Sequence, residues 1–186
     1  MKLVKKQAFG SEWGIFTEEP IAKGSLLFSA KDWVEDEVYG WNILTKNEVE
    51  NLNEKEKQLF LRYSYDIDFG KVTGTFDHSR AKHISNFMNH SCQPNMVYDE
   101  NDNIIAKRPI HRNEELTIDY GNFIVNFDQD FTCNCGARNC RKEILQDDWK
   151  ELCFELGLGF PSFMRNELIH ILKTRASSSF SRRYAV

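Results

Sequence analysis

The stretch that decides the fold runs from residue 86 to residue 95, Asn86-Phe87-Met88-Asn89-His90-Ser91-Cys92-Gln93-Pro94-Asn95. In it an apolar pair enters a dense polar turn that contains cysteine, proline and asparagine. Two later segments complement this turn: Glu115-Leu116-Thr117-Ile118-Asp119-Tyr120-Gly121 and Cys133-Asn134-Cys135-Gly136-Ala137-Arg138-Asn139-Cys140. We expect the three segments to meet in space.

The cysteine spacing indicates a metal site. Three of the five cysteines fall within eight residues, as Cys133-x-Cys135-x4-Cys140. A disulfide framework is disfavoured, because the number is odd and no secretion signal is apparent. Zinc prefers four tetrahedral ligands and accepts thiolate readily, so one corner is left for Cys92, Cys153, a histidine or a water. Cys153 lies among apolar residues and suits an inert core thiol. Cys92 is therefore the better fourth ligand, and four thiolates would make the zinc structural.

Length and charge restrict the class of protein. The chain of 186 residues suits one domain, with or without a small appendage. No apolar run approaches the roughly 20 residues of a membrane helix, and the first residues lack the apolar core of a signal peptide, so we expect an intracellular protein without membrane contact. A net charge of -4 gives no basic excess for phosphates and disfavours direct nucleic-acid binding. It suits a basic partner somewhat better, or simply keeps the chain soluble.

The first half of the chain combines short strands with a different central segment. Strands are expected at residues 3–9, 12–16 and 21–28, where apolar residues lie between turn residues. Two capping patterns, Thr45-x-x-Glu48 and Asn53-x-x-Glu56, predict two helix starts. Residues 31–66 therefore indicate a helical insert. Its acidic patch at residues 32–37 either steers basic substrates or forms a solvated face.

The second half returns to strands and ends in helices. Residues 97–106 predict a hairpin around a loop rich in Asp and Asn, and residues 116–120 alternate as in a strand. Residues 147–157 predict a capped helix that ends at a glycine. Another helix is expected from residue 161 or 162 to residue 173. The tail at residues 176–186, rich in Ser and Arg, is expected to be disordered.

The signature residues resemble a known family. Asn89-His90-Ser91-Cys92-x-Pro94-Asn95 resembles the first signature of the SET-domain protein lysine methyltransferases, and residues 115–121 resemble the second. The cysteine triplet is similar to the post-SET zinc loop of that family, and the resemblance covers roughly residues 1–145. It implies a mainly β (α+β) fold, the SET-domain β-clip of small curled sheets. That fold has a knot-like threading near Asn89–Asn95, to which the helical insert and C-terminal helices would be added.

The resemblance also divides the chain. It implies a SET domain at residues 1–124, with the helical insert at about 31–66, and a post-SET zinc loop at residues 125–146. A C-terminal helical extension would occupy residues 147–175, and the disordered tail residues 176–186. Two copies could form a homodimer through the C-terminal helices.

The activity that the resemblance implies is transfer of methyl groups from S-adenosylmethionine to the ε-amine of a lysine in a protein, such as a histone or another basic protein. The alternative is an inactive SET-type module that only binds a lysine-bearing or basic segment. Such a displacement needs a neutral amine, alignment and exclusion of water rather than a catalytic metal. An apolar channel supplies the neutral amine, because it lowers the pKa of a lysine from about 10.4.

The resemblance assigns roles residue by residue. The catalytic residues would be Tyr120 and, by a looser match, Tyr63. The donor S-adenosylmethionine would be bound by Trp13, Gly14, Asn89, His90, Tyr120 and Ile144, with Leu145 as the alternative to Ile144. The lysine channel would be lined by Tyr63, Tyr65 and Ile118. Structural zinc would be bound by Cys92, Cys133, Cys135 and Cys140.

Three positions depart from the family pattern and leave details of the donor pocket open. Glu12 stands where the family usually has Gly, Asn86 stands for an Arg, and Lys82-His83 replaces a common Gly-Asn. Ile118 has no hydroxyl that could hold a water beside the amine, so we expect two or three methyl groups to be added. Tyr120 would hold and orient the amine rather than act as a strong base, because an ordinary tyrosine is neutral at pH 7.

Overall fold

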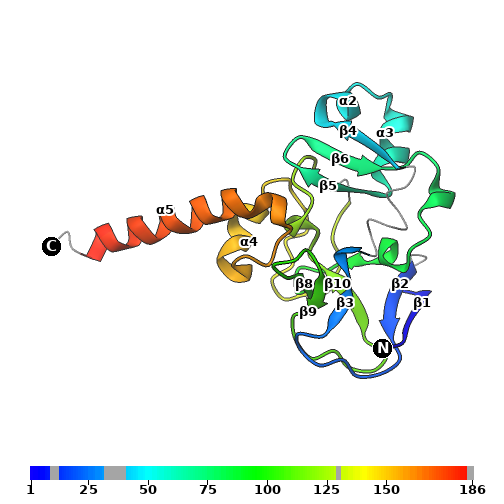
Figure 1. The fold of residues 1–186 in the computed structure, drawn as a ribbon, viewed down its shortest axis with the longest axis horizontal. Helices are drawn as coiled ribbons and strands as arrows, with labels where there is room; N and C mark the ends of the chain where they lie inside the picture. The colour runs from blue at the N-terminus through cyan, green and yellow to red at the C-terminus, as the bar shows by residue number, and fades with distance from the viewer. Residues whose placement is uncertain (9–12, 32–40, 129–130, 184–186) are drawn as a thin grey trace.

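A computed structural model describes residues 1–8, 13–31, 41–128 and 131–183 of the protein. Small curled sheets dominate it, as the sequence predicts (Figure 1). One sheet contains, in spatial order, β1 (Leu3–Gln7), β2 (Trp13–Thr17), β10 (Glu115–Ile118) and β7 (Asn89–His90). A second sheet contains β3 (Leu26–Phe28), β9 (Ile104–Ala106) and β8 (Met96–Tyr98). The mainly β class is therefore confirmed, whereas the knot-like threading stays a prediction.

The strand pairing brings two of the signature segments together. β7 is only two residues long, yet it lies parallel to β10, with Asn89 opposite Thr117 and His90 opposite Ile118. On its other side β10 pairs antiparallel with β2. The backbone of Asn89 and His90 thus lies directly beside the strand that leads into Tyr120.

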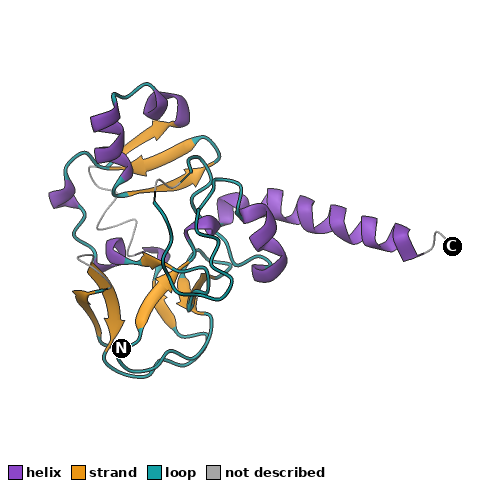
Figure 2. Cartoon of the chain, turned by 180° about the vertical axis from the view of Figure 1, so that it is seen from behind, coloured by secondary structure: helices purple, strands orange, loops and turns teal. Residues whose placement is uncertain are grey.

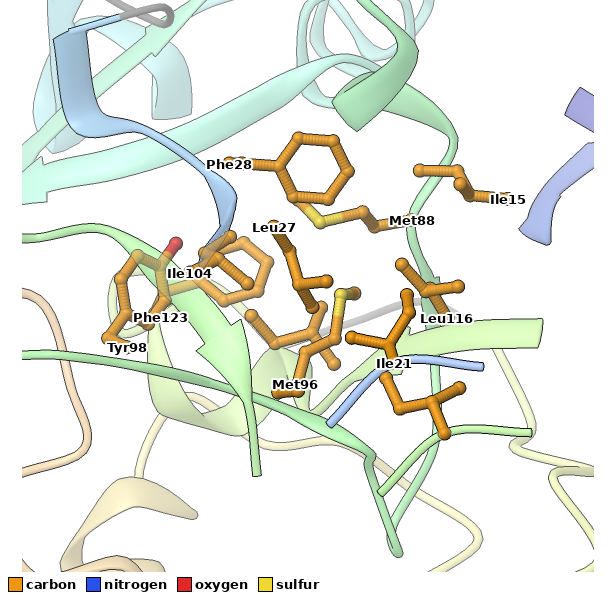
Figure 3. Packing of buried hydrophobic residues seen from close by; sticks show 13 residues of the cluster. Ile15, Ile21, Leu27, Phe28, Met88, Met96, Tyr98, Ile104, Leu116 and Phe123 are labelled. Atoms are coloured by element: carbon orange, nitrogen blue, oxygen red, sulfur yellow. The ribbon is translucent and has the colours of Figure 1, made fainter. Parts of the chain in front are cut away.

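One apolar core lies between the two sheets (Figure 3). Leu116 and Ile118 of β10 are both fully buried, as expected for alternate residues on one face of a strand. Ile15 from β2 and Met96 from β8 are also fully buried in this cluster. Burial of this much apolar surface stabilises the body without help from a metal.

The insert is only partly helical. Its helices α2 (Lys46–Glu50) and α3 (Glu54–Leu61) begin at the predicted caps, Thr45 and Asn53. A three-stranded sheet accompanies them, in the order β4 (Asn42–Thr45), β6 (Lys71–Gly74) and β5 (Ser64–Asp68). The predicted helical insert at about residues 31–66 thus contains both expected helices, the accompanying sheet was not predicted, and the bounds of the insert stay a prediction. The acidic residues at 32–37 lie outside the described residues.

The extra strands form a hairpin that the sequence analysis missed. Gly70 has a φ of +82°, which suits the tight turn between β5 and β6. β5 reads Ser64-Tyr65-Asp66-Ile67-Asp68, in which polar and apolar residues alternate as in a strand, but its buried residue is the polar Asp66. Backbone pairing with β6 and the hydrogen bonds of Asp66 to the backbone of residues 125 and 126 stabilise this strand.

The C-terminal extension packs on the body and then projects away from it (Figures 1 and 2). Helix α4 (Trp149–Leu156) ends at Gly157, as predicted. A 3-10 turn, η4 (Ser162–Met164), then leads into α5 (Arg165–Arg183). Trp149, Cys153 and Leu168 belong to the buried apolar cluster between these helices.

The expected disorder from residue 176 onward is not seen, since α5 continues to Arg183. No glycine or proline follows Pro161. A helix that has already nucleated extends at little cost through a segment without these two helix-breaking residues. Within the described part of the chain, no helix combines the length and the apolar character needed to cross a membrane.

Candidate functional site

Tyr120 lies at the point where β10 ends. The strand stops at Ile118, two residues earlier than predicted, because the side chain of Asp119 caps the 3-10 turn η3 (Tyr120–Asn122) by accepting the N–H of Gly121 at 3.0 Å. The hydroxyl of Tyr120 donates a hydrogen bond to the backbone carbonyl of Met88 at 2.7 Å. Its position is therefore fixed by the stretch that contains Asn89 and His90.

A pocket of about 120 Å³ opens beside Tyr120. The structure brings Tyr63, Tyr65 and Tyr120, all predicted for the site, to its lining. Tyr63 packs edge-on against His78 and Phe87, with ring centroids 4.9 and 6.4 Å apart. The pocket is thus a narrow space with tyrosines on more than one side.

Several lining residues were not predicted from the sequence. These are mainly aromatic or apolar residues that follow Tyr120 or lie in β8: Tyr98, Phe123, Ile124 and Phe127. Burial raises the pKa of Tyr98 above its ordinary value, so this phenol stays protonated near neutral pH. The run of apolar residues after Tyr120 was the only sequence signal for this wall.

Ile118 is not among the residues that line the pocket. Alternation along β10 places it on the same face as Leu116, and both side chains are fully buried in the core. The role predicted for Ile118 in the lysine channel stays a prediction.

The predicted donor residues of β2 and β7 lie on either side of β10, and the side chain of Asn89 connects the three strands. The side-chain amide of Asn89 donates to the carbonyl of Trp13 at 3.1 Å and to Oε1 of Glu115 at 2.7 Å. A side chain at Gly14 would collide with that same carboxylate oxygen. Gly14 is thus required by the close approach of two strands, and Trp13 remains 47% exposed beside it.

The ring of His90 joins Tyr120 to the cysteines. Its Nδ1 accepts the backbone N–H of Tyr120 at 3.1 Å, so Nε2 carries the proton and lies 3.2 Å from the sulfur of Cys92. Burial lowers the pKa of His90 to about 4, although Asp119 raises it, and Arg141 lowers it further. The ring is therefore neutral at pH 7. No feature of the sequence indicated this role for the side chain.

The cysteines fit a tetrahedral zinc site. The four sulfur atoms of Cys92, Cys133, Cys135 and Cys140 lie within 4.8 Å of one another. Cys92 and Cys133 are 3.9 Å apart, close to the roughly 3.8 Å that tetrahedral Zn–S bonds of about 2.3 Å require. Cys153 lies in the apolar cluster of the C-terminal helices instead.

Backbone N–H groups favour thiolates in this cluster. The N–H of Cys92 points to the sulfur of Cys135 at 3.5 Å, and the N–H of Arg141 points to the sulfur of Cys92 at 3.4 Å. Burial raises the pKa of Cys135, but the amides of Ala137 and Cys92 lower it, and the result is about 6. Cys135 can therefore supply the thiolate form that zinc binds, whereas burial raises the pKa of Cys92 and of Cys133 in the same cluster.

Ile144 is buried under the cysteine cluster. It is 1% exposed and packs with Cys92, Cys133 and Tyr120, and the expected contact of Ile144 with a donor molecule stays a prediction. Its neighbour Leu145, the alternative that the sequence left open, is 45% exposed.

Phe131 offers a second exposed apolar surface. It is 41% exposed, and its centroid lies 6.2 Å from that of His90 and 6.1 Å from that of Tyr120. The sequence analysis missed this aromatic residue, although its place just before the first clustered cysteine could have indicated it. Glu12 lies outside the described residues, and Asn86 lines the pocket.

Arg141, also missed, ties three segments together. Its two terminal nitrogens contact both carboxylate oxygens of Asp119 at 2.8 and 2.6 Å, and its Nε contacts Asp148 at 2.9 Å. Asp119 is 1% exposed, so this two-pronged pair is largely desolvated. The arginine thereby fixes the end of the cysteine loop against the turn that carries Tyr120 and against the start of α4.

A two-residue strand that sets Asn-His beside a tyrosine turn, next to a four-cysteine cluster, defines a SET-type domain with a post-SET site. The model of the SET domain family matches residues 12–121. The chain therefore belongs to the SET domain family.

The chain is similar to several curated proteins. It is 31% identical to histone-lysine N-methyltransferase SUV39H1-A of Danio rerio, over 72% of this chain and 38% of that protein. It is 28% identical to histone-lysine N-methyltransferase SUV39H2 of Xenopus tropicalis, over 71% of this chain and 36% of that protein. Histone-lysine N-methyltransferase Su(var)3-9 of Drosophila pseudoobscura pseudoobscura is 30% identical to this chain, over 74% of this chain and 24% of that protein. The chain thus spans well under half the length of these relatives.

Proposed function

We propose that the chain is an S-adenosylmethionine-dependent protein-lysine N-methyltransferase. The observation that carries the proposal is the placement of Tyr120, whose hydroxyl is anchored to the Met88 carbonyl at the wall of an aromatic pocket. Asn89 and His90 lie on the neighbouring strand. The similarity to proteins named histone-lysine N-methyltransferases supports the same activity.

On the lysine side, the pocket prepares the amine. Its volume of about 120 Å³ suits the slender end of a lysine side chain, and its rings disfavour the charged form and exclude water. The hydroxyl of Tyr120 holds the neutral amine in line for attack on the methyl carbon. The proton of the amine leaves to water before the attack, so no residue has to act as a strong base.

On the donor side, the surface around Asn89 and Gly14 would bind S-adenosylmethionine, and we call it the donor surface. The amide nitrogen of Asn89 is engaged by Trp13 and Glu115, which leaves its side-chain oxygen to accept from the amino group of a bound donor. The backbone at Gly14, which has no side chain, would permit the donor to approach closely. Phe131 and Leu145 offer exposed apolar surface for the adenine. S-adenosylmethionine would supply an activated methyl group to this arrangement.

On the zinc side, we propose a structural ion bound by Cys92, Cys133, Cys135 and Cys140. Four thiolates close the coordination sphere and leave no position for a substrate. The role of the ion would be to fix the loop that presents Phe131 and, through His90, to support Tyr120.

The partner would be a protein with an accessible target lysine, and histones are the first candidates because the relatives are named for them. A net charge of -4 suits basic histone tails and gives no reason to invoke nucleic acid as a direct partner. We propose an intracellular compartment in which histones or similar basic proteins are present. Contact with a membrane is not part of the proposal.

The test is titration of S-adenosylmethionine into zinc-loaded protein by calorimetry, followed by transfer of radiolabelled methyl groups to core histones and other basic proteins. We expect binding and transfer, and mass spectrometry should locate the label on lysine. Binding of a folded, zinc-loaded chain to basic peptides without donor binding would favour the inactive binding module instead.

Pairing of two copies through the C-terminal helices stays a prediction, and the projection of α5 from the body is what supports it (Figure 1). Sedimentation of the full chain and of a chain ending at Arg175 tests it. A dimer lost on truncation supports the pairing, and a monomeric full chain contradicts it.

A further inference from the structure

The two walls of the pocket come from segments that are far apart in the sequence. One wall belongs to residues 61–66, at the start of β5, and the other to residues 123–127, after Tyr120. Their spacing determines how much room surrounds the amine. The contacts that join the two walls therefore bear on the outcome of the reaction.

Asp66 reaches from the first wall to the second. Its side chain is buried, and Oδ2 accepts the backbone N–H groups of both Val125 and Asn126, the latter at 2.9 Å. These two donors lie between Ile124 and Phe127, which both line the pocket. The carboxylate therefore fixes the backbone of the second wall rather than one of its side chains.

Asn126 makes the reciprocal contact. It is also buried, and its amide nitrogen donates to the carbonyl of Asp68 at 3.0 Å. Its amide oxygen accepts the N–H of Gly70 at 2.6 Å, in the turn between β5 and β6. Each wall thus sends one buried polar side chain to the backbone of the other, and we name this pair the Asp66–Asn126 clasp.

A buried carboxylate at this place is not explained by packing. Burial raises the pKa of Asp66, although its hydrogen bonds to Asn126 and Val125 lower it. An apolar side chain would fill the space at less cost in desolvation. A hydrogen-bond acceptor at position 66 provides what an apolar side chain cannot, a fixed distance between the two walls of the pocket.

We propose that the Asp66–Asn126 clasp sets the width of the lysine pocket and so limits how many methyl groups one amine receives. The inference rests on the proposed function and deepens it, because it makes Asp66 and Asn126 positioning residues that determine product specificity. Each added methyl group enlarges the amine, and pockets discriminate by one such group through steric fit.

The test compares individual methylation steps. A histone peptide that the wild-type chain methylates is prepared unmodified, monomethylated and dimethylated, and kcat/KM is measured for each form. In Asp66→Ala and Asn126→Ala, we expect the ratio of kcat/KM for dimethylated over unmodified peptide to rise about tenfold. The Kd for S-adenosylmethionine should stay within about twofold of wild type, because the clasp lies outside the donor surface.

Three further variants separate width from general damage. Asp66→Asn should keep the wild-type ratio, because its amide oxygen can accept the same two N–H groups. Asp68→Ala is the matched control in the same strand, since its side chain bonds only to Phe69 and Lys71 while its carbonyl remains for Asn126. Asp66→Glu keeps the carboxylate but displaces the second wall by one methylene, so it should raise the ratio even if the alanine variants fail to fold.

The outcomes discriminate between the two levels of inference. Absence of transfer by the folded, zinc-loaded wild-type chain contradicts the proposed function itself. Transfer by wild type, with the ratio unchanged in Asp66→Glu and in every alanine variant that folds, contradicts the clasp alone. A ratio that changes as much in Asp68→Ala as in Asp66→Ala also contradicts it.

Discussion

The two regions that meet at Tyr120 are stabilised by different physics. The sheet region has a continuous apolar core, to which Ile15, Met96, Leu116 and Ile118 contribute fully buried side chains. The cysteine region, by contrast, gathers around one buried aliphatic residue, Ile144, and four thiols. Burial of apolar surface stabilises the first region, whereas the second buries little apolar surface and contains four thiols that could hold a metal ion.

This difference shows why the residues of the candidate site lie at the boundary between the two regions. The ring of His90 contacts the backbone of Tyr120 on one side and the sulfur of Cys92 on the other. His90 thus links the turn that carries Tyr120 to the cysteine region. Perturbations of the two regions should therefore be separable by experiment.

The largest effect is expected from Tyr120→Phe. The ring packing is kept, but the hydroxyl that donates to Met88 and orients the amine is lost. Methyl transfer should fall by about 10²-fold or more, as when one positioned polar group is removed from an active site. Initial rates with core histones measure it. The Tm and the Kd for S-adenosylmethionine should stay near wild type, and unaltered rates would contradict the role of the hydroxyl.

The next effect is that of zinc removal, by chelator or by Cys133→Ser. The cysteine region should lose its order while the sheet region stays folded, and transfer should fall by about tenfold or more. Hydrogen exchange measures this as faster exchange at residues 131–146 with protection retained in β2 and β10. Cys153→Ala is the control, because its thiol lies in the helical cluster. Equal loss of protection in both regions would contradict their independence.

A smaller effect is expected from Arg141→Lys. Lysine keeps the charge but cannot bridge both oxygens of Asp119 and also reach Asp148. Arg141 is partly exposed, so the free energy of unfolding should fall by about 1–3 kcal/mol, which is less than breaking a fully buried ion pair would cost. Urea unfolding measures it. Arg138→Lys, at an exposed position in the same loop, is the control and should change little.

The smallest effect is expected in the insert, from Thr45→Ala. This change removes the side-chain cap of α2, a bond from the N–H of Glu48 at 3.2 Å. The free energy of unfolding should fall by about 1 kcal/mol, with no change in zinc affinity. Thermal unfolding and a competition assay for zinc measure the two quantities. A loss of zinc would show that the insert is coupled to the cysteine region.

Much of the site could be predicted because its signals are local. Cys133, Cys135 and Cys140 lie on one loop, and the helix caps at Thr45 and Asn53 depend on neighbours three residues away. The burial of Ile118 and Ile144 could not be predicted for the opposite reason. Whether a side chain faces a pocket or the core depends on the register with distant strands and on what covers it.

The sequence by itself determined the class of fold, the grouping of Cys133, Cys135 and Cys140 and the segment that carries Tyr120, because each depends on residue types at short, fixed spacings. Only the tertiary structure decided that His90 joins Tyr120 to Cys92, that Arg141 bridges Asp119 and Asp148, and that Asp66 and Asn126 join the pocket walls. These contacts link positions up to 60 residues apart. Polar side chains of this kind leave no periodic trace in a sequence, since their partners are brought to them only by chain folding.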